Sequence, residues 1–168
     1  MSGGIFMDQT IHDFDIIRYF VNSDIKQVFA QGSCLVDPTI ATIGDVDTTA
    51  VIVTFENGVI GTITNSRKAV YGQDQRAEAF GSAGMIQLNN KVDDSYSLSC
   101  GDFIGSALTG FTQFTRYKEA YSREIEAFVD SVLGRESAPV TVADAQKAAR
   151  IAAAAKQSLA NNCAVSIS

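Results

Sequence analysis

The chain contains no tryptophan and only two prolines, three cysteines and one histidine among its 168 residues. The cysteines Cys34, Cys100 and Cys163 are odd in number and lie far apart without a Cys-x-x-Cys pair, so the sequence predicts neither a disulfide framework nor a zinc site. Such cysteine usage is typical of a reducing compartment, and we expect a cytoplasmic protein.

Positive charge and long apolar runs are scarce as well. There are 13 lysines and arginines against 19 aspartates and glutamates, a formal net charge of -6, whereas a nucleic-acid partner requires a basic patch. No apolar run approaches the roughly 18 residues that span a bilayer, and the first residues lack the basic and apolar regions of a signal peptide. We therefore expect neither nucleic acid nor membrane as a partner, while an uncharged polyol is compatible with this charge.

What is present is sufficient for one folded domain with a core, since hydrophobic residues make up 46% of the chain. The first predicted element is a helix over 11–21, where apolar residues recur at helical spacing. Thr10 precedes this helix as a candidate N-cap, and Asn22, Ser23 and Asp24 end the pattern.

The middle of the chain has the pattern of β-strands, because β-branched and aromatic residues are concentrated there in short segments. The predicted strands are 28–30, 48–55, 59–65, 76–80, 85–88 and 96–100. Glu56-Asn57-Gly58 is typical of a hairpin turn, and Asn57-Gly58 can take the positive φ angles of a type I′ turn. We expect these strands to form a meander-like antiparallel sheet.

The last third of the chain returns to helical spacing. One helix has an apolar face formed by Tyr121, Ile125, Phe128, Val129 and Val132. Gly134 closes this helix, Thr141 opens a second, alanine-rich helix, and Asn161 and Asn162 end it.

Together these elements predict an α+β fold, a large open antiparallel or mixed β-sheet with helices packed on one face. Helices from three segments cannot cover both faces of such a sheet. The segment 48–55 has apolar residues on both sides, so the open face is a candidate interface with another subunit.

The single histidine, His12, is one of the strongest candidates for a catalytic residue. His12 follows Asp8 by four residues and precedes Asp15 by three, and on a helix these spacings bring the three side chains toward one side. A carboxylate there can orient an imidazole, which titrates near physiological pH and can exchange a proton with a substrate. Taken alone, such a histidine is more often a capping or core group. Asp13 and Asp15 are more readily assigned to helix-dipole roles than to catalysis.

A metal site is a second interpretation of the same residues. Asp8, His12 and Asp15 could bind a divalent ion through two carboxylates and one imidazole. This alternative is weaker, because the chain has no second histidine and no further ligand motif.

Three ordered motifs resemble one family of enzymes. The run Gly-Gly-x-x-x-Asp-x-x-x-His-x-x-Asp, from Gly3 to Asp15, resembles the start of the C-terminal domain of the Gfo/Idh/MocA oxidoreductases. The segments 65–76 and 80–85 resemble central strands of that domain, and 116–124 resembles its late helix, so the likeness covers nearly the whole chain. The motifs look most like the inositol 2-dehydrogenase branch of the family.

The resemblance implies an enzyme that oxidises a secondary hydroxyl of a cyclitol or sugar to a ketone, with hydride transfer to NAD. It implies that His12 is the general base, that Asp8 orients the imidazole and contacts a ring hydroxyl, and that Tyr71 lies at the polyol. Tyr117 and Tyr121 are weaker candidates. The alternative for Tyr71 is a packing role at a strand end, which is common for tyrosine.

The chain lacks the fingerprint of a dinucleotide-binding fold. It has no Gly-x-Gly-x-x-Gly turn after a first strand, and Gly81-Ser82-Ala83-Gly84 has neither the spacing nor a following helical pattern. In the resembled family that motif, and a catalytic lysine, belong to an N-terminal Rossmann domain. We therefore expect residues 1–168 to be the C-terminal substrate-binding and oligomerisation domain of a longer two-domain dehydrogenase, inactive alone, with NAD bound mainly by the missing domain.

The resemblance also implies a homodimer or homotetramer that forms through the open sheet face. One further alternative is non-catalytic: an α+β module that binds a polyol or mediates oligomerisation and keeps the fold without a cofactor domain. The sequence leaves open which cyclitol or sugar is bound, and whether NAD or NADP is preferred.

Overall fold

The chain folds as two compact units. The computed structural model describes residues 3–92, 96–107, 109 and 113–167. Unit 1 comprises Met1–Lys68 and Val140–Ser168, and unit 2 comprises Ala69–Pro139. Unit 1 therefore contains both ends of the chain, and unit 2 is the segment between them.

Unit 1 begins with a helical segment that is longer than the sequence predicts. A π-helical turn, η1 (Phe6–Thr10), runs directly into α1 (Ile11–Val21), which confirms the predicted helix and extends it upstream. Thr10 is not an N-cap, because the helical backbone has already begun; its buried hydroxyl instead donates to Asn65 Oδ1 at 2.8 Å. Asn22 ends α1 in the left-handed conformation, with φ 50°.

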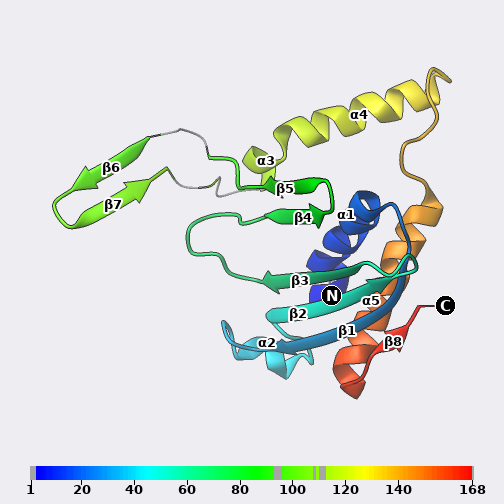
Figure 1. Ribbon diagram of the computed structural model, residues 1–168, viewed down its shortest axis with the longest axis horizontal. Coiled ribbons are helices and arrows are strands. Elements are labelled where there is room, and N and C mark those ends of the chain that lie inside the picture. Colours follow the sequence, from blue (N-terminus) through cyan, green and yellow to red (C-terminus); the bar gives the residue numbers. More distant parts are fainter. Residues whose placement is uncertain (1–2, 93–95, 108, 110–112, 168) are drawn as a thin grey trace. The chain divides into compact units, whose positions relative to one another are not determined.

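Four antiparallel strands form the sheet of unit 1, in the order β3-β2-β1-β8 (Figure 1). The strands are β1 (Ile25–Ser33), β2 (Thr48–Phe55), β3 (Ile60–Ser66) and β8 (Val165–Ser166), and a short helix, α2 (Thr39–Thr42), follows β1 in the sequence. Phe29 pairs with Ile52, which pairs in turn with Thr62. The predicted strands within 48–65 are thus confirmed, whereas 28–30 is only the centre of a longer strand.

The turn between β2 and β3 is a hairpin, as predicted, but of another type. The N–H of Gly58 donates to the carbonyl of Phe55 at 3.0 Å, and the N–H of Phe55 donates to the carbonyl of Val59 at 2.9 Å. Gly58 has a φ of 85°, while Asn57 does not adopt a positive φ. The type I′ prediction is wrong because the loop has three residues, with the glycine in the left-handed bulge position, instead of two.

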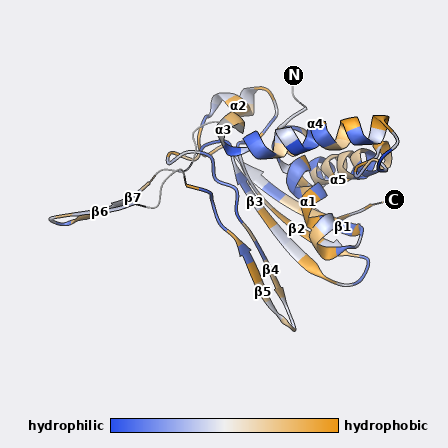
Figure 2. Ribbon diagram, turned by 90° about the horizontal axis from the view of Figure 1, so that it is seen from above, coloured by the Kyte–Doolittle hydropathy of each residue, from blue (hydrophilic) through white to orange (hydrophobic). Residues whose placement is uncertain are grey.

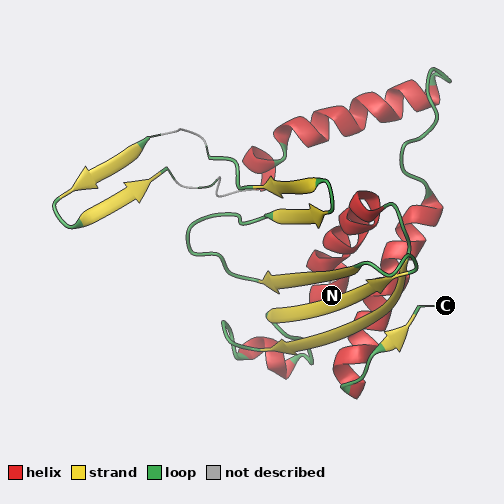
Figure 3. Cartoon of the chain, in the orientation of Figure 1, coloured by secondary structure: helices red, strands yellow, loops and turns green. Residues whose placement is uncertain are grey.

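The core of unit 1 lies between one face of the sheet and the helices α1 and α5 (Val142–Asn161), which cover that same face (Figure 3). Along β2, Val51, Val53 and Phe55 are buried, while Ala50 and Ile52 alternate with them and lie on the open face. The helices contribute Phe14, Ile151, Ala152, Ala154 and Ala155 to this core. The predicted α+β fold with helices on one face of an antiparallel sheet is confirmed.

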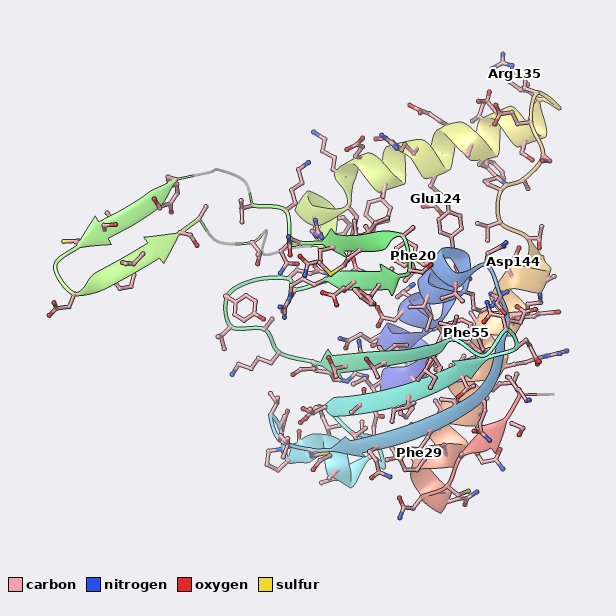
Figure 4. The ribbon with its side chains drawn as sticks, in the orientation of Figure 1. Phe20, Phe29, Phe55, Glu124, Arg135 and Asp144 are labelled. Atoms are coloured by element: carbon pink, nitrogen blue, oxygen red, sulfur yellow. The ribbon has the colours of Figure 1, made fainter. Side chains whose placement is uncertain are left out.

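The last long helix has the predicted ends. The Asp144 carboxylate, near the start of α5 (Figure 4), accepts hydrogen bonds from the Thr141 N–H at 2.9 Å and hydroxyl at 2.7 Å. These bonds, the hydroxyl first, lower the pKa of Asp144. Asn162 ends α5 in the left-handed conformation, with φ 50°. Residue Thr141 is therefore a true cap, in contrast to Thr10.

Unit 2 contains two separate hairpins instead of a continuation of the large sheet. They pair β4 (Ala77–Gly81) with β5 (Gly84–Leu88), and β6 (Ser97–Cys100) with β7 (Phe103–Ser106). The expectation of one continuous meander is wrong in this respect, because the described strands fall into three sheets. A non-strand connection separates β3 from β4 and contains Gly72 with φ 115°, a backbone conformation incompatible with an extended strand.

Unit 2 also contains two helices, α3 (Gln113–Arg116) and α4 (Lys118–Val132). Gly134 follows α4 with φ 69°, as expected for a glycine that closes a helix. Figure 2 shows hydrophobic and hydrophilic residues alternating around α4, and none of its residues is fully buried. Among the described residues, no helix combines the length and hydrophobicity that a membrane span requires.

Candidate active site

The predicted site residues Asp8 and His12 lie in unit 1, on the helical segment that joins η1 to α1. Asp8 belongs to the π-helical turn and His12 to the first turn of α1, and both are exposed. The π-turn changes the angular relation between the two side chains from that of a regular α-helix, and such turns are frequent at functional sites. Nothing in the sequence indicates this turn.

The carboxylate of Asp8 is held by an arginine from the end of β3. Arg67 donates from one terminal nitrogen to Asp8 Oδ2 at 3.0 Å and from the other to Asp45 Oδ2 at 3.3 Å. In the described part of the chain, no hydrogen bond or ion pair joins Asp8 to His12. The predicted orientation of the imidazole by Asp8 therefore stays a prediction.

The imidazole of His12 is accessible from solvent. It is exposed, and among the described residues it makes neither a hydrogen bond nor an ion pair. Burial raises the pKa of the adjacent Asp13, and the charge of His12 offsets a part of that effect. An exposed imidazole without a structural partner is suited to acid–base chemistry and is not a core histidine.

Asp13 has a more specific position than a helix-dipole role requires. Its Oδ2 accepts a hydrogen bond from Asn65 Nδ2 at 2.8 Å, and Asn65 Oδ1 accepts from Thr10. Burial raises the pKa of Asp13, and the Asn65 hydrogen bond and the charge of His12 only partly offset this effect. The Thr10–Asn65–Asp13 chain of hydrogen bonds fixes the start of α1 on β3, next to His12 in the sequence.

Asp15 does not join Asp8 and His12 in a common cluster. Its carboxylate pairs with Arg18 at 3.3 Å, one turn later on the same helix, and Arg18 also pairs with Asp24 at 3.0 Å. The described residues contain no group of three histidine, cysteine or acidic side chains placed to hold a metal ion. The arrangement of Asp8, His12 and Asp15 thus gives no support to the metal-site alternative.

Tyr71 lies in unit 2, within a separate polar cluster. Its phenol donates to Asp74 Oδ2, and this bond raises the pKa of Tyr71. Arg76 donates to Asp74 at 2.8 Å and 2.9 Å and Asn90 donates at 2.6 Å, and these bonds, Arg76 first, lower the pKa of Asp74 to about 2. With its proton engaged, the phenol oxygen of Tyr71 has only acceptor capacity left for a ligand hydroxyl.

The weaker candidates Tyr117 and Tyr121 pack against each other in unit 2. Their rings lie edge to face, with centroids 6.5 Å apart, and the Tyr117 hydroxyl donates to Gln75 Oε1. The Arg116 guanidinium lies over the Tyr117 ring at 5.9 Å. These contacts are typical of a packing cluster.

A buried carboxylate supports the region from which Arg67 comes. Asp47 is fully buried and accepts hydrogen bonds from the N–H groups of Leu35, Val36 and Asp37, at 2.9, 2.9 and 2.8 Å, and from the Thr48 hydroxyl at 2.8 Å. Burial opposes the charged form, but these donors outweigh it and lower the pKa of Asp47 to about 2. The carbonyl of Asp47 also accepts the N–H of Arg67 at 2.8 Å.

The sequence did not single out Arg67, Asp45, Asp47 or Asn65, although Arg67 and Asn65 lie inside a motif that carries the family resemblance. Apart from Thr48, which directly follows Asp47, the partners of these side chains are 10 to 59 residues away. Only the folded chain brings these groups together, so spacing along the sequence contains no signal for them.

Comparison with known proteins relates the chain to one family over most of its length. The family model described as the Gfo/Idh/MocA C-terminal domain matches residues 1–87. The chain is 43% identical to the myo-inositol 2-dehydrogenase of Thermotoga maritima over 95% of this chain and 48% of that protein. The chain spans about half the length of the curated relatives it matches.

Solved structures agree with the sequence relatives. A myo-inositol dehydrogenase from Corynebacterium glutamicum superimposes with a TM-score of 0.92 at 32% identity, covering 99% of this chain and 50% of that one. A scyllo-inositol dehydrogenase from Lactobacillus casei with bound NAD(H) and scyllo-inositol gives a TM-score of 0.92 at 26% identity, with coverages of 99% and 49%.

Proposed function

Because this chain belongs to the Gfo/Idh/MocA oxidoreductase family, we propose that it is the C-terminal, substrate-binding domain of an NAD-dependent dehydrogenase of the inositol 2-dehydrogenase type. The reaction is oxidation of a secondary hydroxyl of a cyclitol, or of a related sugar, to a ketone. The observation that carries the proposal is the exposed imidazole of His12, four residues after an Asp8 carboxylate that is fixed by Arg67. The names of the relatives support the substrate class.

In this proposal His12 is the general base. Oxidation of a secondary alcohol removes a proton from the hydroxyl oxygen and a hydride from its carbon, and the imidazole takes the proton. Asp8 holds its Oδ2 against Arg67, while its Oδ1 has no partner among the described residues and can accept a hydrogen bond from a neighbouring ring hydroxyl or from the imidazole. Tyr71, in unit 2, stays a predicted polyol contact on the resemblance alone.

The described residues of this chain do not fit the pyrophosphate of NAD. Neither Gly-x-x-Gly segment presents a helix N-terminus to a phosphate, because Gly58 to Gly61 leads into β3 and Gly81 to Gly84 joins the strands of a hairpin and leads into β5. We therefore assign NAD binding mainly to an N-terminal Rossmann domain of the full-length protein, where hydride acceptance would take place. In this proposal, the present chain binds the polyol and accepts its hydroxyl proton.

A homodimer or homotetramer through the open sheet face belongs to the same proposal. Opposite the buried face of β2, Ile52 is 48% exposed, and its cross-strand neighbours are Phe29 and Thr62. Ile52→Lys should reduce the mass of the particle measured by light scattering, whereas Ile43→Lys, at a 70% exposed isoleucine after α2, should leave it unchanged. A stable wild-type monomer would contradict the expected assembly.

The catalytic proposal is tested by NAD+-dependent oxidation of a panel of cyclitols and sugars by the full-length protein. Turnover of myo-inositol should fall by about 10²–10⁴-fold in His12→Ala, the range for loss of a general base. Asp15→Asn is the matched control, since this carboxylate lies on the same helix but pairs with Arg18. No turnover on any polyol, or turnover indifferent to His12, would favour the non-catalytic polyol-binding or oligomerisation module.

Residues 1–168 alone should be inactive and should bind polyols weakly, because the Rossmann domain contributes the rest of the proposed site. Calorimetry of this chain with myo-inositol measures that expectation directly. A micromolar dissociation constant would mean that the polyol site is complete without the cofactor domain.

A further inference from the structure

Arg67 occupies a position that links the candidate site to the rigid part of unit 1. Its main chain is fixed at the end of β3, because its N–H donates to the buried Asp47 carbonyl at 2.8 Å. Its side chain is 25% exposed and divides its two terminal nitrogens between the carboxylates of Asp8 and Asp45, which are 43% and 19% exposed. The guanidinium is thus a bridge between a residue of the candidate site and one outside it.

Asp45 fixes the other arm of the bridge. Its Oδ1 accepts the N–H of the fully buried Ile5 at 3.1 Å, while its Oδ2 accepts from Arg67. Gly4 has a φ of 90°, and a Cβ at this position would lie 2.9 Å from Asp45 Oδ1. The glycine therefore permits the close approach of Asp45 to the start of the helical segment that contains Asp8.

The bridge leaves the two oxygens of Asp8 in different situations. Oδ2 is bound to Arg67, and Oδ1 has no partner in the described part of the chain. A planar guanidinium held by a second carboxylate sets the orientation of the group it binds, which a flexible lysine cannot do as well. Arg67 therefore favours one rotamer of Asp8.

We propose that Arg67 is a positioning residue of the candidate active site, acting through Asp8 and anchored by Asp45. This inference rests on the proposed function, in which Asp8 contacts the polyol or the imidazole. Arg67 itself does not have to touch the substrate. Its contribution is to present the free oxygen of Asp8 in a fixed direction.

A double-mutant cycle on the full-length dehydrogenase tests the inference. Arg67→Met should lower kcat/KM for myo-inositol at least tenfold in the wild-type background but less than twofold in Asp8→Asn, because an effect that passes through Asp8 vanishes when Asp8 is neutral. Arg67→Lys keeps the charge without the bridge and should give an intermediate loss. Arg18→Met is the matched control, since Arg18 also bridges two carboxylates, and should change kcat/KM less than twofold.

A second readout needs neither turnover nor cofactor. The chain has a single histidine, so the NMR signals of the His12 imidazole are assigned without ambiguity. Arg67→Met should shift these signals in the 168-residue chain, and Arg18→Met should not. Urea unfolding of each variant separates a loss of fold from a loss of positioning.

The outcomes distinguish the inference from the function on which it rests. Losses from Arg67→Met and Asp8→Asn that multiply in the double variant would overturn the inference and leave the role of Asp8 intact. An Asp8→Asn variant with wild-type turnover would overturn the inference together with the proposed role of Asp8. Unchanged imidazole signals in a folded Arg67→Met chain would contradict the positioning role on structural grounds.

Discussion

Unit 1 contains every fully buried residue in the described part of the chain, whereas unit 2 contributes none. The apolar residues of unit 2 are nevertheless numerous and large: Phe80 is 83% exposed, Ile104 80% and Phe128 65%. Burial of apolar surface is the main favourable term in folding. The comparison indicates that unit 1 has an apolar core of its own, while the described part of unit 2 is held by the hydrogen bonds of its hairpins and helices.

The two units are more alike in their polar networks than in the burial of their apolar residues. Asp47 in unit 1 and Asp74 in unit 2 each accept several hydrogen bonds, and each has a pKa lowered to about 2. The donors differ, because Asp47 is held by backbone N–H groups and Asp74 by side chains of Arg76, Tyr71 and Asn90. Unit 1 thus has an apolar core and a hydrogen-bonded cluster around Asp47, whereas the described part of unit 2 has only the cluster around Asp74.

The largest expected difference between the units is in their response to removal of an aromatic ring. Phe14→Ala, at a fully buried position, should lower the free energy of unfolding by about 3–5 kcal/mol. Phe80→Ala, on the exposed face of a hairpin, should change it by less than about 0.5 kcal/mol. Urea denaturation at low protein concentration measures both. Equal losses would show that unit 2 has a core of its own.

A smaller effect on stability is expected from the buried carboxylate of Asp47, and this effect depends on pH. The pKa of Asp47 in the folded chain lies below the ordinary value of 3.8, so its contribution is fully present above about pH 4 and is lost as the pH falls through about 2. Asp47→Asn should reduce stability at pH 6, less than Phe14→Ala does, and should flatten the decline of stability between about pH 4 and pH 2. Asp74→Asn, in contrast, should leave the unfolding of unit 1 unchanged.

The cap of α5 should have an effect of about 1 kcal/mol. Thr141→Ala removes the hydroxyl that donates to Asp144 at the start of the helix that covers the core. Because α5 packs on unit 1, the loss should appear in the unfolding of unit 1 by circular dichroism. Ser122→Ala, an exposed hydroxyl in the middle of α4, is the comparison in unit 2 and should be nearly neutral.

The smallest effect is expected at Asp13. Burial raises its pKa, so the charged form is disfavoured in the folded state, and this cost is absent at low pH and grows as the pH rises through the folded pKa. Asp13→Asn keeps an oxygen for Asn65 and removes the charge, so stability at pH 7 should remain within about 1 kcal/mol of the wild type or increase. A large loss of unfolding free energy would mean that the charge itself is required, for example by His12.

The elements that the sequence predicted well are those with a local physical signal. The helix α1, the hairpin of β2 and β3 and both ends of α5 follow from apolar spacing, turn residues and a capping threonine. These signals act over a few residues, and the same few residues form the structure. Thr10 had the same signal as Thr141, and the prediction failed there because the helix had already begun at Phe6.

The parts that the sequence missed depend on distant partners. The bridge from Asp8 through Arg67 to Asp45 joins three segments of the chain. The hydrogen bonds of the Asp47 carboxylate join two. The division of the strands into three sheets also depends on which strands meet, which alternation within a strand does not specify. The site residues His12, Asp8 and Tyr71 came from motif resemblance, and their roles stay predictions.

The position of unit 2 between Lys68 and Val140 has a consequence for the history of the chain. For the core of unit 1, the whole of unit 2 is one closed loop of about 70 residues, and the entropy of closing a loop grows only with the logarithm of its length, so doubling it costs about 0.6 kcal/mol. Unit 2 can therefore become longer or shorter, or be replaced, during evolution with little loss of stability in the core of unit 1. Variation among descendants should accumulate there, while the segments that close the loop remain fixed.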